Sequence, residues 1–374
     1  MGWRVPATSA DFVIIGGGII GCAIARALAM GGAGRVMVIE RGQLGAEASG
    51  AAAGVLAVGS SRAPRGVLFE LKRASAALFP ALADALRSET GIDVEYATGG
   101  LLDLAFSSRD AELLDRLVAR RQEQGFAVER LDADAVRSRY PEINPAVRRG
   151  AWFADDRAVN NVSLVEALHA SARAHGVEFR LGAPVTRIAA RQQHVIAVEA
   201  NGEEIALGHL IVAAGAWAGD LGALLGVKIP VRSDRGEMIA VRPATPLALT
   251  LSWRDGYLVP RRNGEVLIGS TSARGATEKL VTARNAATLL GRAVRMMPAL
   301  ADAAIVRTWA GLRPLSALRR PIIGPLRGFA NVTLAIGHHR SGILLAPITA
   351  QLVAELLLHN APSIPLHPFC YRPR

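Results

Sequence analysis

A glycine-rich turn near the N-terminus constrains the fold of this chain more than any other feature. Gly16-Gly-Gly18-Ile-Ile-Gly21 has the G-x-G-x-x-G spacing and directly follows an apolar run at residues 12–15. Residues 19–30, rich in Ala, Leu and Ile, predict a helix, and residues 35–39 predict a second buried strand. Two strands joined by a helix within about 30 residues form a βαβ unit, which belongs to a parallel sheet.

The three glycines of the G-x-G-x-x-G spacing each have a physical reason that points to a dinucleotide. Gly16 permits the tight turn, Gly18 lets the backbone approach a pyrophosphate, and Gly21 lets the helix pack closely on the sheet. The helix N-terminus offers N–H groups and a partial positive charge to phosphates. Glu40 ends the second strand, where a carboxylate accepts both hydroxyls of a ribose. The sequence therefore predicts a Rossmann-type dinucleotide site.

The residues that follow Glu40 favour FAD over a nicotinamide cofactor. Residues 41–56 are dominated by Gly, Ala and other small residues. Small side chains over so many positions let the backbone lie against a flat, extended ligand. A plain NAD domain would continue directly into its next helix.

Composition excludes several other classes of protein. With 20% charged and 51% hydrophobic residues, the chain is neither disordered nor collagen-like. Its 2 cysteines cannot form a disulfide framework or a cysteine zinc site. The apolar run at residues 12–25 is interrupted by glycines and is shorter than the roughly 20 residues of a membrane-spanning helix. We expect a cytoplasmic protein with no transmembrane segment.

The net charge of +11 raises the question of nucleic-acid binding. Nearly all of the 43 basic residues are arginines, scattered along the chain without a basic block or interleaved aromatic residues. We therefore expect no nucleic-acid partner. The positive charge can instead attract small anionic substrates towards the protein. The acidic pair Asp155-Asp156 has no suitably spaced further ligand, so we expect a solvated turn and no metal site.

Patterns typical of a parallel sheet lie at both ends of the chain, and antiparallel patterns lie between them. Residues 231–270 alternate strongly around a hairpin-like turn at residues 260–264. Helical patterns cover residues 74–90, 110–124, 163–175, 277–297 and 343–358, and residues 93–106 alternate like strands. The fold class expected is α/β, with a discontinuous Rossmann-type FAD-binding domain and an inserted, mainly antiparallel substrate-binding domain. The first comprises residues 1–80, 150–224 and 308–374, and the second comprises residues 81–149 and 225–307.

Six motifs carry a resemblance to a known family. They lie at residues 11–21, 44–54, 211–217, 257–261, 309–314 and 337–347. In this order they resemble the D-amino-acid oxidase family of FAD enzymes and, within it, the glycine oxidases of thiamine-thiazole biosynthesis. The resemblance implies hydride transfer from the α-carbon of a small amine or amino acid to flavin N5. The imine then hydrolyses to an oxo acid, and dioxygen is reduced to hydrogen peroxide.

The resemblance also implies site residues, carried over position by position. Tyr257, Arg313 and Arg340 would hold the substrate, with no catalytic residue beyond the flavin. The residues that would contact a non-covalent FAD are Gly16, Gly18, Ile19, Ile20, Gly21, Glu40, Arg41, Ala48, Ser49, Ala53, Gly54, Val55, the backbone of Val185, His338, His339, Ser341, Gly342, Ile343 and Leu344. For the side chains of His338 and His339 we expect a structural role.

Three positions depart from the glycine-oxidase pattern. Val55 stands where Met is expected, His339 where Phe is frequent, and Ser272 where a larger residue occurs. Smaller lining groups leave room for a D-side chain or an N-methyl group, so glycine, sarcosine and small D-amino acids are all candidate substrates.

Three alternatives remain open from the sequence. The first is a dehydrogenase of the same fold that passes electrons to a quinone or a partner protein. The second is a tRNA-modifying flavoenzyme that uses the positive charge. A non-catalytic flavin-binding subunit is disfavoured, because a pair of substrate anchors would have no purpose there. A homo-oligomer is compatible with the sequence.

Overall fold

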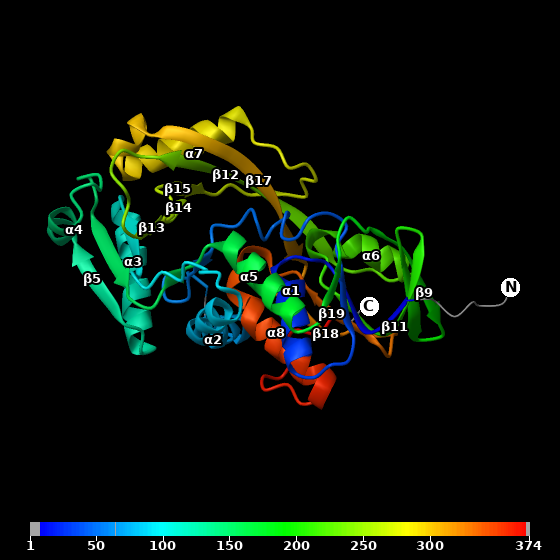
Figure 1. Cartoon of the computed structure of the whole chain (residues 1–374). Coiled ribbons are helices and arrows are strands. Elements are labelled where there is room, and N and C mark those ends of the chain that lie inside the picture. The colour runs from blue at the N-terminus through cyan, green and yellow to red at the C-terminus, as the bar shows by residue number, and fades with distance from the viewer. Residues whose placement is uncertain (1–7, 64, 372–374) are drawn as a thin grey trace.

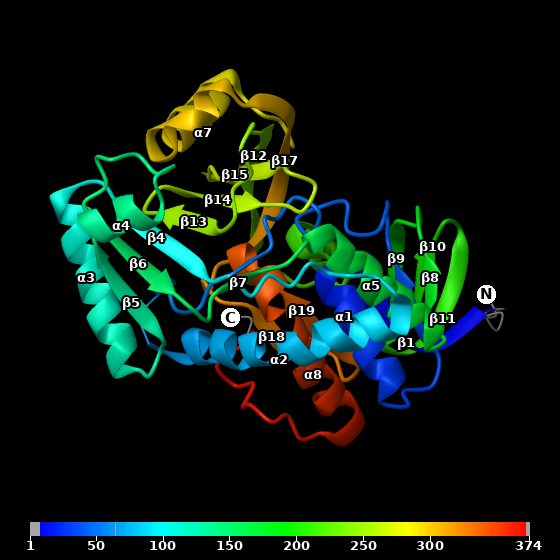
Figure 2. The ribbon, with the colours of Figure 1, turned by 60° about the vertical axis from the view of Figure 1, so that its left-hand side comes forward.

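Two β-sheets form the frame of the molecule in the computed structural model, which describes residues 8–63 and 65–371 (Figures 1 and 2). In spatial order the first sheet contains β18 (Ile322–Pro325), β19 (Val332–Ile336), β11 (Glu203–Val212), β1 (Thr8–Ile15), β2 (Val36–Ile39) and β8 (Glu178–Arg180). β1 pairs in parallel with both β11 and β2, as the βαβ unit requires. β9 (Val185–Arg191) and β10 (His194–Ala200) extend this sheet antiparallel from β11.

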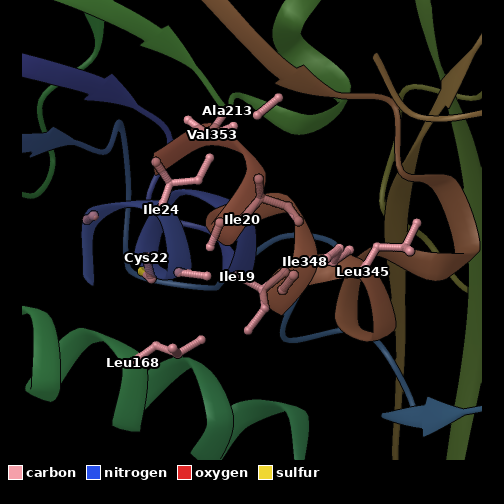
Figure 3. Packing of buried hydrophobic residues seen from close by; sticks show 14 of the residues in the cluster. Ile19, Ile20, Cys22, Ile24, Leu168, Ala213, Leu345, Ile348 and Val353 are labelled. Carbon is pink, nitrogen blue, oxygen red and sulfur yellow. The ribbon is translucent and has the colours of Figure 1, made fainter. Parts of the chain in front are cut away.

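Helices cover one face of the first sheet. They are α1 (Ile19–Met30), α2 (Val67–Thr90), α5 (Asn161–Ala174) and α8 (Gly342–His359). Figure 3 shows α1 between α5 and α8, with Leu168 and Val353 belonging to the same apolar cluster. The β9–β10 hairpin and α6 (Ala218–Leu224) contribute to a separate apolar cluster on the sheet. The first sheet is therefore buried on both faces, as is usual for parallel strands.

The second sheet is mainly antiparallel. In order it contains β16 (Ala273–Arg274), β12 (Val231–Arg242), β15 (Val266–Gly269), β14 (Gly256–Pro260), β13 (Thr250–Trp253), β4 (Leu101–Ala105), β6 (Arg149–Phe153) and β5 (Val128–Asp132), and β17 (Ala304–Ser316) also pairs with β12. The helices beside it are α3 (Ser108–Glu123), α4 (Ala133–Arg139) and α7 (Ala283–Met296). The short strands β3 (Val55–Leu56) and β7 (Arg157–Ala158) pair with each other.

The predicted elements agree with the structure where the pattern is continuous. α1 has the predicted bounds, and β14 and β15 form the predicted hairpin. Within residues 93–106 only β4 is a strand, so the alternation predicted too much sheet there. β17 was not predicted because residues 304–308 are exposed and carry no alternating apolar signal. The α/β fold class is confirmed, with one largely parallel and one mostly antiparallel sheet.

The two sheets interleave along the chain. The first sheet takes strands from residues 8–39, 178–212 and 322–336, whereas the second takes strands from residues 101–153 and 231–316. The predicted domain boundaries after residues 149 and 307 fall inside β6 and β17, which both pair with strands of the second sheet. The division into domains stays a prediction.

Within the described residues, one helical segment is long and apolar enough to cross a membrane by length and composition. It runs over His339–His359 and includes α8. α8 packs against α1 and α2 and contains a proline, Pro347. Leu345, Leu352 and Val353 of α8 are fully buried in the apolar cluster of Figure 3. α8 is therefore a core helix of this globular fold.

Candidate active site

A cavity of about 450 Å³ lies at the carboxyl ends of the parallel strands. Its lining includes the ends of β1, β2 and β19, the residues just after β11 and, from the second sheet, residues of β12, β14 and β17. Ligands of open α/β sheets bind at this edge. Most of the predicted site residues line it: Gly16, Gly18, Ile19, Ile20, Glu40, Arg41, Ala48, Ser49, Ala53, Gly54, Val55, Val185, Tyr257, Arg313, His338, His339, Arg340, Gly342 and Ile343. Gly21, Ser341 and Leu344 are not part of this lining.

The glycine turn brings the start of α1 close to the sheet. Gly16 has a φ of +118°, and a Cβ there would lie 2.5 Å from the carbonyl oxygen of Ala213 on the neighbouring chain segment. A Cβ on Gly21 would lie 1.9 Å from the carbonyl oxygen of Gly16. Gly21 therefore sets the approach of helix to strand without facing the cavity itself.

Glu40 is held beside this turn by the backbone. Its two carboxylate oxygens accept hydrogen bonds from the N–H groups of Gly17 at 2.7 Å and Gly42 at 2.9 Å. Each carboxylate oxygen has further lone-pair capacity, so the side chain can still accept ribose hydroxyls. Next to it, the guanidinium of Arg41 lies 3.6 Å from the centre of the Trp217 ring.

The small-residue segment 48–54 is held from several elements. Ser49 Oγ accepts from the N–H of Ile19 at 2.9 Å, which ties the segment to the start of α1. Asn161 Nδ2 donates to the carbonyl oxygen of Ser49 at 2.7 Å, and Arg261 Nη2 donates to that of Ala53 at 2.9 Å. Trp309 Nε1 donates to the carbonyl oxygen of Ala51 at 3.1 Å.

Sequence reasoning assigned no role to the side chains that hold this segment. Arg261 and Trp309 lie within two of the motifs that carry the family resemblance, and that position is the signal that points to them. Asn161, the first residue of α5, belongs to none of these motifs. Its side chain is buried and reaches the segment only through the tertiary structure.

Arg313 dominates the side of the cavity formed by the second sheet. It lies opposite Asp234 in the antiparallel pairing of β17 with β12. Its Nη2 donates to Ser270 Oγ at 2.8 Å and its Nη1 to the carbonyl oxygen of Thr271 at 3.1 Å. The guanidinium covers Gly236, where a Cβ would lie 1.9 Å from Nη2. Burial lowers the pKa of Arg313, although a guanidinium stays protonated in proteins.

Asp234 is a fully buried carboxylate that the sequence analysis did not single out. It accepts hydrogen bonds from Ser272 Oγ at 2.6 Å and from His339 Nε2 at 2.7 Å, and it lies 3.6 Å from Nη1 of Arg313. Burial alone raises the pKa of Asp234, but these hydrogen bonds and the charge of Arg313 outweigh burial and hold the pKa below its ordinary value. An acid within an alternating strand is the signal that points to it.

The other predicted substrate-side residues have different surroundings. The hydroxyl of Tyr257 donates to Met238 Sδ at 3.4 Å. Arg340 is exposed at the cavity wall. His338 is buried, with Nε2 3.1 Å from Thr349 Oγ1, and burial lowers its pKa to about 3. His338 is therefore a neutral side chain.

The prediction of a solvated turn at Asp155-Asp156 is wrong for Asp156. Its side chain is buried and accepts hydrogen bonds from the N–H groups of Val58, Gly59 and Ser60. These bonds replace water around the carboxylate. Among residues 8–63 and 65–371, no group of three or more His, Cys, Asp or Glu side chains could hold a metal ion.

The cavity suits an extended dinucleotide such as FAD. A Cβ on Gly54, whose φ is +72°, would lie 2.0 Å from the carbonyl oxygen of Val159, so only glycine fits in this part of the wall. Gly18 supplies no side-chain cap to α1, and beyond the N–H of Ile19, which is bonded to Ser49, the positive end of the helix suits a phosphate. The small-residue segment lets the ligand lie against backbone.

Known proteins similar to this chain are consistent with an FAD site in this cavity. The family model described as FAD dependent oxidoreductase (DAO) matches residues 11–356. A glycine oxidase of Geobacillus kaustophilus is 34% identical over 363 residues, which are 96% of each chain. The crystal structure of glycine oxidase from that organism superposes with a TM-score of 0.93 at 33% identity, covering 97% of this chain and 98% of that one.

Two further relatives widen the comparison. The bifunctional protein ThiO/ThiG of Nostoc is 34% identical over 96% of this chain, but the chain spans about half, 54%, of its length. Iminodiacetate oxidase from Chelativorans superposes with a TM-score of 0.89 at 25% identity, covering 96% of this chain and 98% of that one. Because the family model and the full-length relatives cover nearly the whole chain, the chain belongs to the DAO family of FAD-dependent oxidoreductases.

Proposed function

We propose that this protein is an amino-acid oxidase of the glycine-oxidase kind that oxidises glycine, sarcosine or a small D-amino acid. Dioxygen is the electron acceptor in this proposal. Membership of the DAO family makes FAD the cofactor. The observation that carries the substrate class is Arg313, a buried cation in the wall of the cavity whose guanidinium is fixed by Ser270 and Thr271.

Arg313 suits the carboxylate of an amino acid. Two of its N–H groups are used by protein oxygens, so others remain for a carboxylate in a paired arrangement. Asp234, 3.6 Å away, balances part of the charge and keeps the buried guanidinium stable before substrate binds. Arg340 adds a second cation at the exposed side of the same wall.

The remaining groups orient the substrate and leave room for a small substituent on it. Tyr257 has a hydroxyl beside Met238 that can turn to a carboxylate oxygen. Gly236 and Gly311 bring no side chain into the cavity wall, and Val55 is small. When bound, FAD supplies the hydride acceptor, and the protein supplies the position and the electrostatics.

FAD binding is proposed to be non-covalent and to use the glycine turn, Glu40, Arg41, the segment 48–54, Val185 and the loop at residues 338–344. Gly21 and Leu344 support this surface from beneath, because both are buried and neither lines the cavity. Neither cysteine of the chain lines the cavity. Acid denaturation should therefore release all flavin, and colour retained by the denatured protein would contradict this mode.

The relatives support the choice of substrates. Proteins named glycine oxidase and iminodiacetate oxidase share the fold at TM-scores of 0.93 and 0.89. In keeping with the resemblance to glycine oxidases of that pathway and with the ThiO/ThiG relatives, we place the reaction in thiamine biosynthesis. We also propose a cytoplasmic location, and the low cysteine content fits a reducing compartment.

Anaerobic titration of the purified holoenzyme tests this function. Glycine, sarcosine, D-alanine and D-proline are added separately, and bleaching of the flavin absorbance is followed. We expect at least one to bleach the flavin, and readmitted oxygen to restore the colour with formation of hydrogen peroxide. If all four leave the spectrum unchanged, the substrate class is wrong. Bleaching that oxygen fails to reverse, but that a quinone or dye reverses, indicates a dehydrogenase.

A further inference from the structure

His339, whose side chain lines the cavity, is hydrogen-bonded to the buried Asp234, and the proposed function assigns no proton transfer to this pair. Nε2 of His339 lies 2.7 Å from Oδ2 of Asp234. Asp234 is fully buried, whereas the His339 side chain is 26% exposed and lines the cavity. His339 also has a φ of +51°, a conformation rare outside glycine that is found where surrounding contacts hold a residue in place.

The hydrogen bond assigns the protons on this imidazole. Hydrogen bonds and the nearby Arg313 keep the pKa of Asp234 low, so its carboxylate is ionised and accepts. Nε2 of His339 must then donate, and in the neutral ring Nδ1 keeps its lone pair. No hydrogen bond to Nδ1 is made by residues 8–63 or 65–371.

The charged groups around His339 come from three elements. Asp234 on β12 favours the protonated ring. Burial lowers the pKa of His339, and Arg340 in the same turn and Arg313 on β17 lower it further. The ring is therefore neutral near pH 7 and able to accept a proton, which it would release readily again.

Oxidation of an amino acid creates a need for such an acceptor. Near neutral pH the substrate enters as an ammonium, but loss of the α-hydrogen as hydride requires the lone pair of the neutral amine. Arg313 and Arg340 are permanent cations and cannot take the proton. His339, in the turn between β19 and α8, lines the cavity and combines a lone pair with a partly exposed side chain.

We propose that Nδ1 of His339 accepts the proton of the substrate ammonium and that Asp234 is the residue that positions its ring. One N–H bond of the substrate breaks, its electron pair stays on nitrogen, and an Nδ1–H bond forms. The exposed part of the ring then passes the proton to water. This inference rests on the proposed function, because it needs an amino-acid or amine substrate.

The test is the pH dependence of flavin reduction in the holoenzyme, measured by anaerobic rapid mixing with the substrate that bleaches the wild type. His339→Phe removes the acceptor, and His339→Asn removes it while suiting the positive φ. We expect both to reduce the flavin about 100-fold more slowly near pH 7. Near pH 10, where much of the amine is already neutral, both should approach the wild-type rate.

Asp234→Asn should show the same pH-dependent loss to a smaller extent, about tenfold, because the imidazole keeps a partner but loses the charge that stabilises its protonated form. His194→Asn is the matched control, since His194 is exposed at the tip of the β9–β10 hairpin and away from the cavity. It should follow the wild type at every pH.

Two outcomes overturn the assignment of His339. Wild-type rates near pH 7 in both His339 variants would show that the ring takes no proton. A loss of equal size at every pH would assign it to packing alone. Failure of every amine and amino acid to reduce the wild-type flavin is a different result, because it removes the proposed function together with this inference.

Discussion

The two sides of the cavity are built from different materials. The side formed by the first sheet consists mainly of backbone and small residues, with Gly16 and Gly54 at points that admit no Cβ. The opposite side carries an ionic cluster, in which the buried Asp234 contacts both Arg313 of the second sheet and His339 of the turn before α8. The first side suits a long ligand that is recognised through its phosphates. The second suits a small ligand that is recognised through charge.

This difference also concerns distance along the chain. The glycine turn, Glu40 and the segment 48–54 lie within about forty residues, so local spacing reveals them. Asp234 and His339 are 105 residues apart and meet only because β12, β17 and the turn before α8 converge. Changes on the two sides should therefore have separable effects, on FAD retention and on substrate turnover respectively.

The largest separable effect is expected for Arg313→Ala. A substrate carboxylate largely removed from water would lose its fixed partner, and breaking such a pair costs about 3–5 kcal/mol. At about 1.36 kcal/mol per tenfold, kcat/KM should fall by roughly two to four orders of magnitude. FAD content, measured by absorbance, should stay near wild type.

Arg313→Lys is the matched control, and it should recover only part of the loss because an ammonium cannot form the planar paired contact. Activity within about threefold of wild type in the alanine variant would indicate that Arg340, and not Arg313, binds the substrate carboxylate. Loss of FAD together with activity would make Arg313 a structural residue.

The next effect concerns the backbone side of the cavity. Gly54→Ala forces an alanine into a left-handed conformation and places its Cβ 2.0 Å from the carbonyl oxygen of Val159. Strain and overpacking together should cost about 2–4 kcal/mol. We expect weaker FAD retention and a lower free energy of unfolding in denaturant titration.

Gly42→Ala serves as the control for Gly54→Ala. The nearest atom to a Cβ there is Glu40 Oε1 at 3.8 Å, and the φ of Gly42 is not in the left-handed region. This variant should keep its FAD. Equal loss of FAD in both variants would show that the close approach at Gly54 does not control binding.

Glu40→Ala is expected to weaken FAD retention by about 1.5–3 kcal/mol, because a charged acceptor for ribose hydroxyls is lost. Glu40→Gln distinguishes the loss of ribose binding from the loss of backbone contacts. Its amide oxygen still accepts a hydrogen bond from the N–H of Gly17 or of Gly42. Equilibrium dialysis of FAD checks both variants. Unchanged affinity in the alanine variant would place the ribose elsewhere, while substrate turnover per bound flavin should not change in either.

The effect that is smallest near neutral pH is a pH dependence of stability from His338. Its pKa is about 3 in the folded protein, against about 6.5 in the unfolded chain. Between these values the unfolded state binds more protons, so the free energy of unfolding falls as pH decreases below about 6.5. The slope from one group is at most about 1.4 kcal/mol per pH unit.

Denaturant titrations of the His338→Gln variant should therefore show a flatter acid limb than wild type. The limb will not vanish, because burial also lowers the pKa of His209 to about 4 and gives the same sign. An unchanged limb in the variant would show that His338 is not buried as a neutral ring. A far-ultraviolet circular dichroism spectrum like that of the wild type near pH 7.5 serves as the control for correct folding.

The fold was predictable to the extent that its signals are local. The βαβ unit and α1 follow from a single periodic stretch, and the hairpin of β14 and β15 follows from alternation around one turn. β17 was not predicted because its first residues are exposed and show no apolar pattern. Its position beside β12 depends on strand pairing. The prediction of a solvated turn at Asp156 was wrong for a related reason. The N–H groups that bind its buried carboxylate lie nearly a hundred residues away in the sequence.

The sequence by itself determined the dinucleotide side of this protein, because glycine spacing and small side chains act on neighbouring backbone. It also indicated Arg313 and Tyr257 through the family resemblance. Only the tertiary structure decided what surrounds Arg313: Asp234 from the opposite strand, Ser270 and Thr271 from the adjoining segment, and His339 from the turn before α8. Charge balance in a buried site depends on distances between side chains, and those distances exist only after the strands have paired.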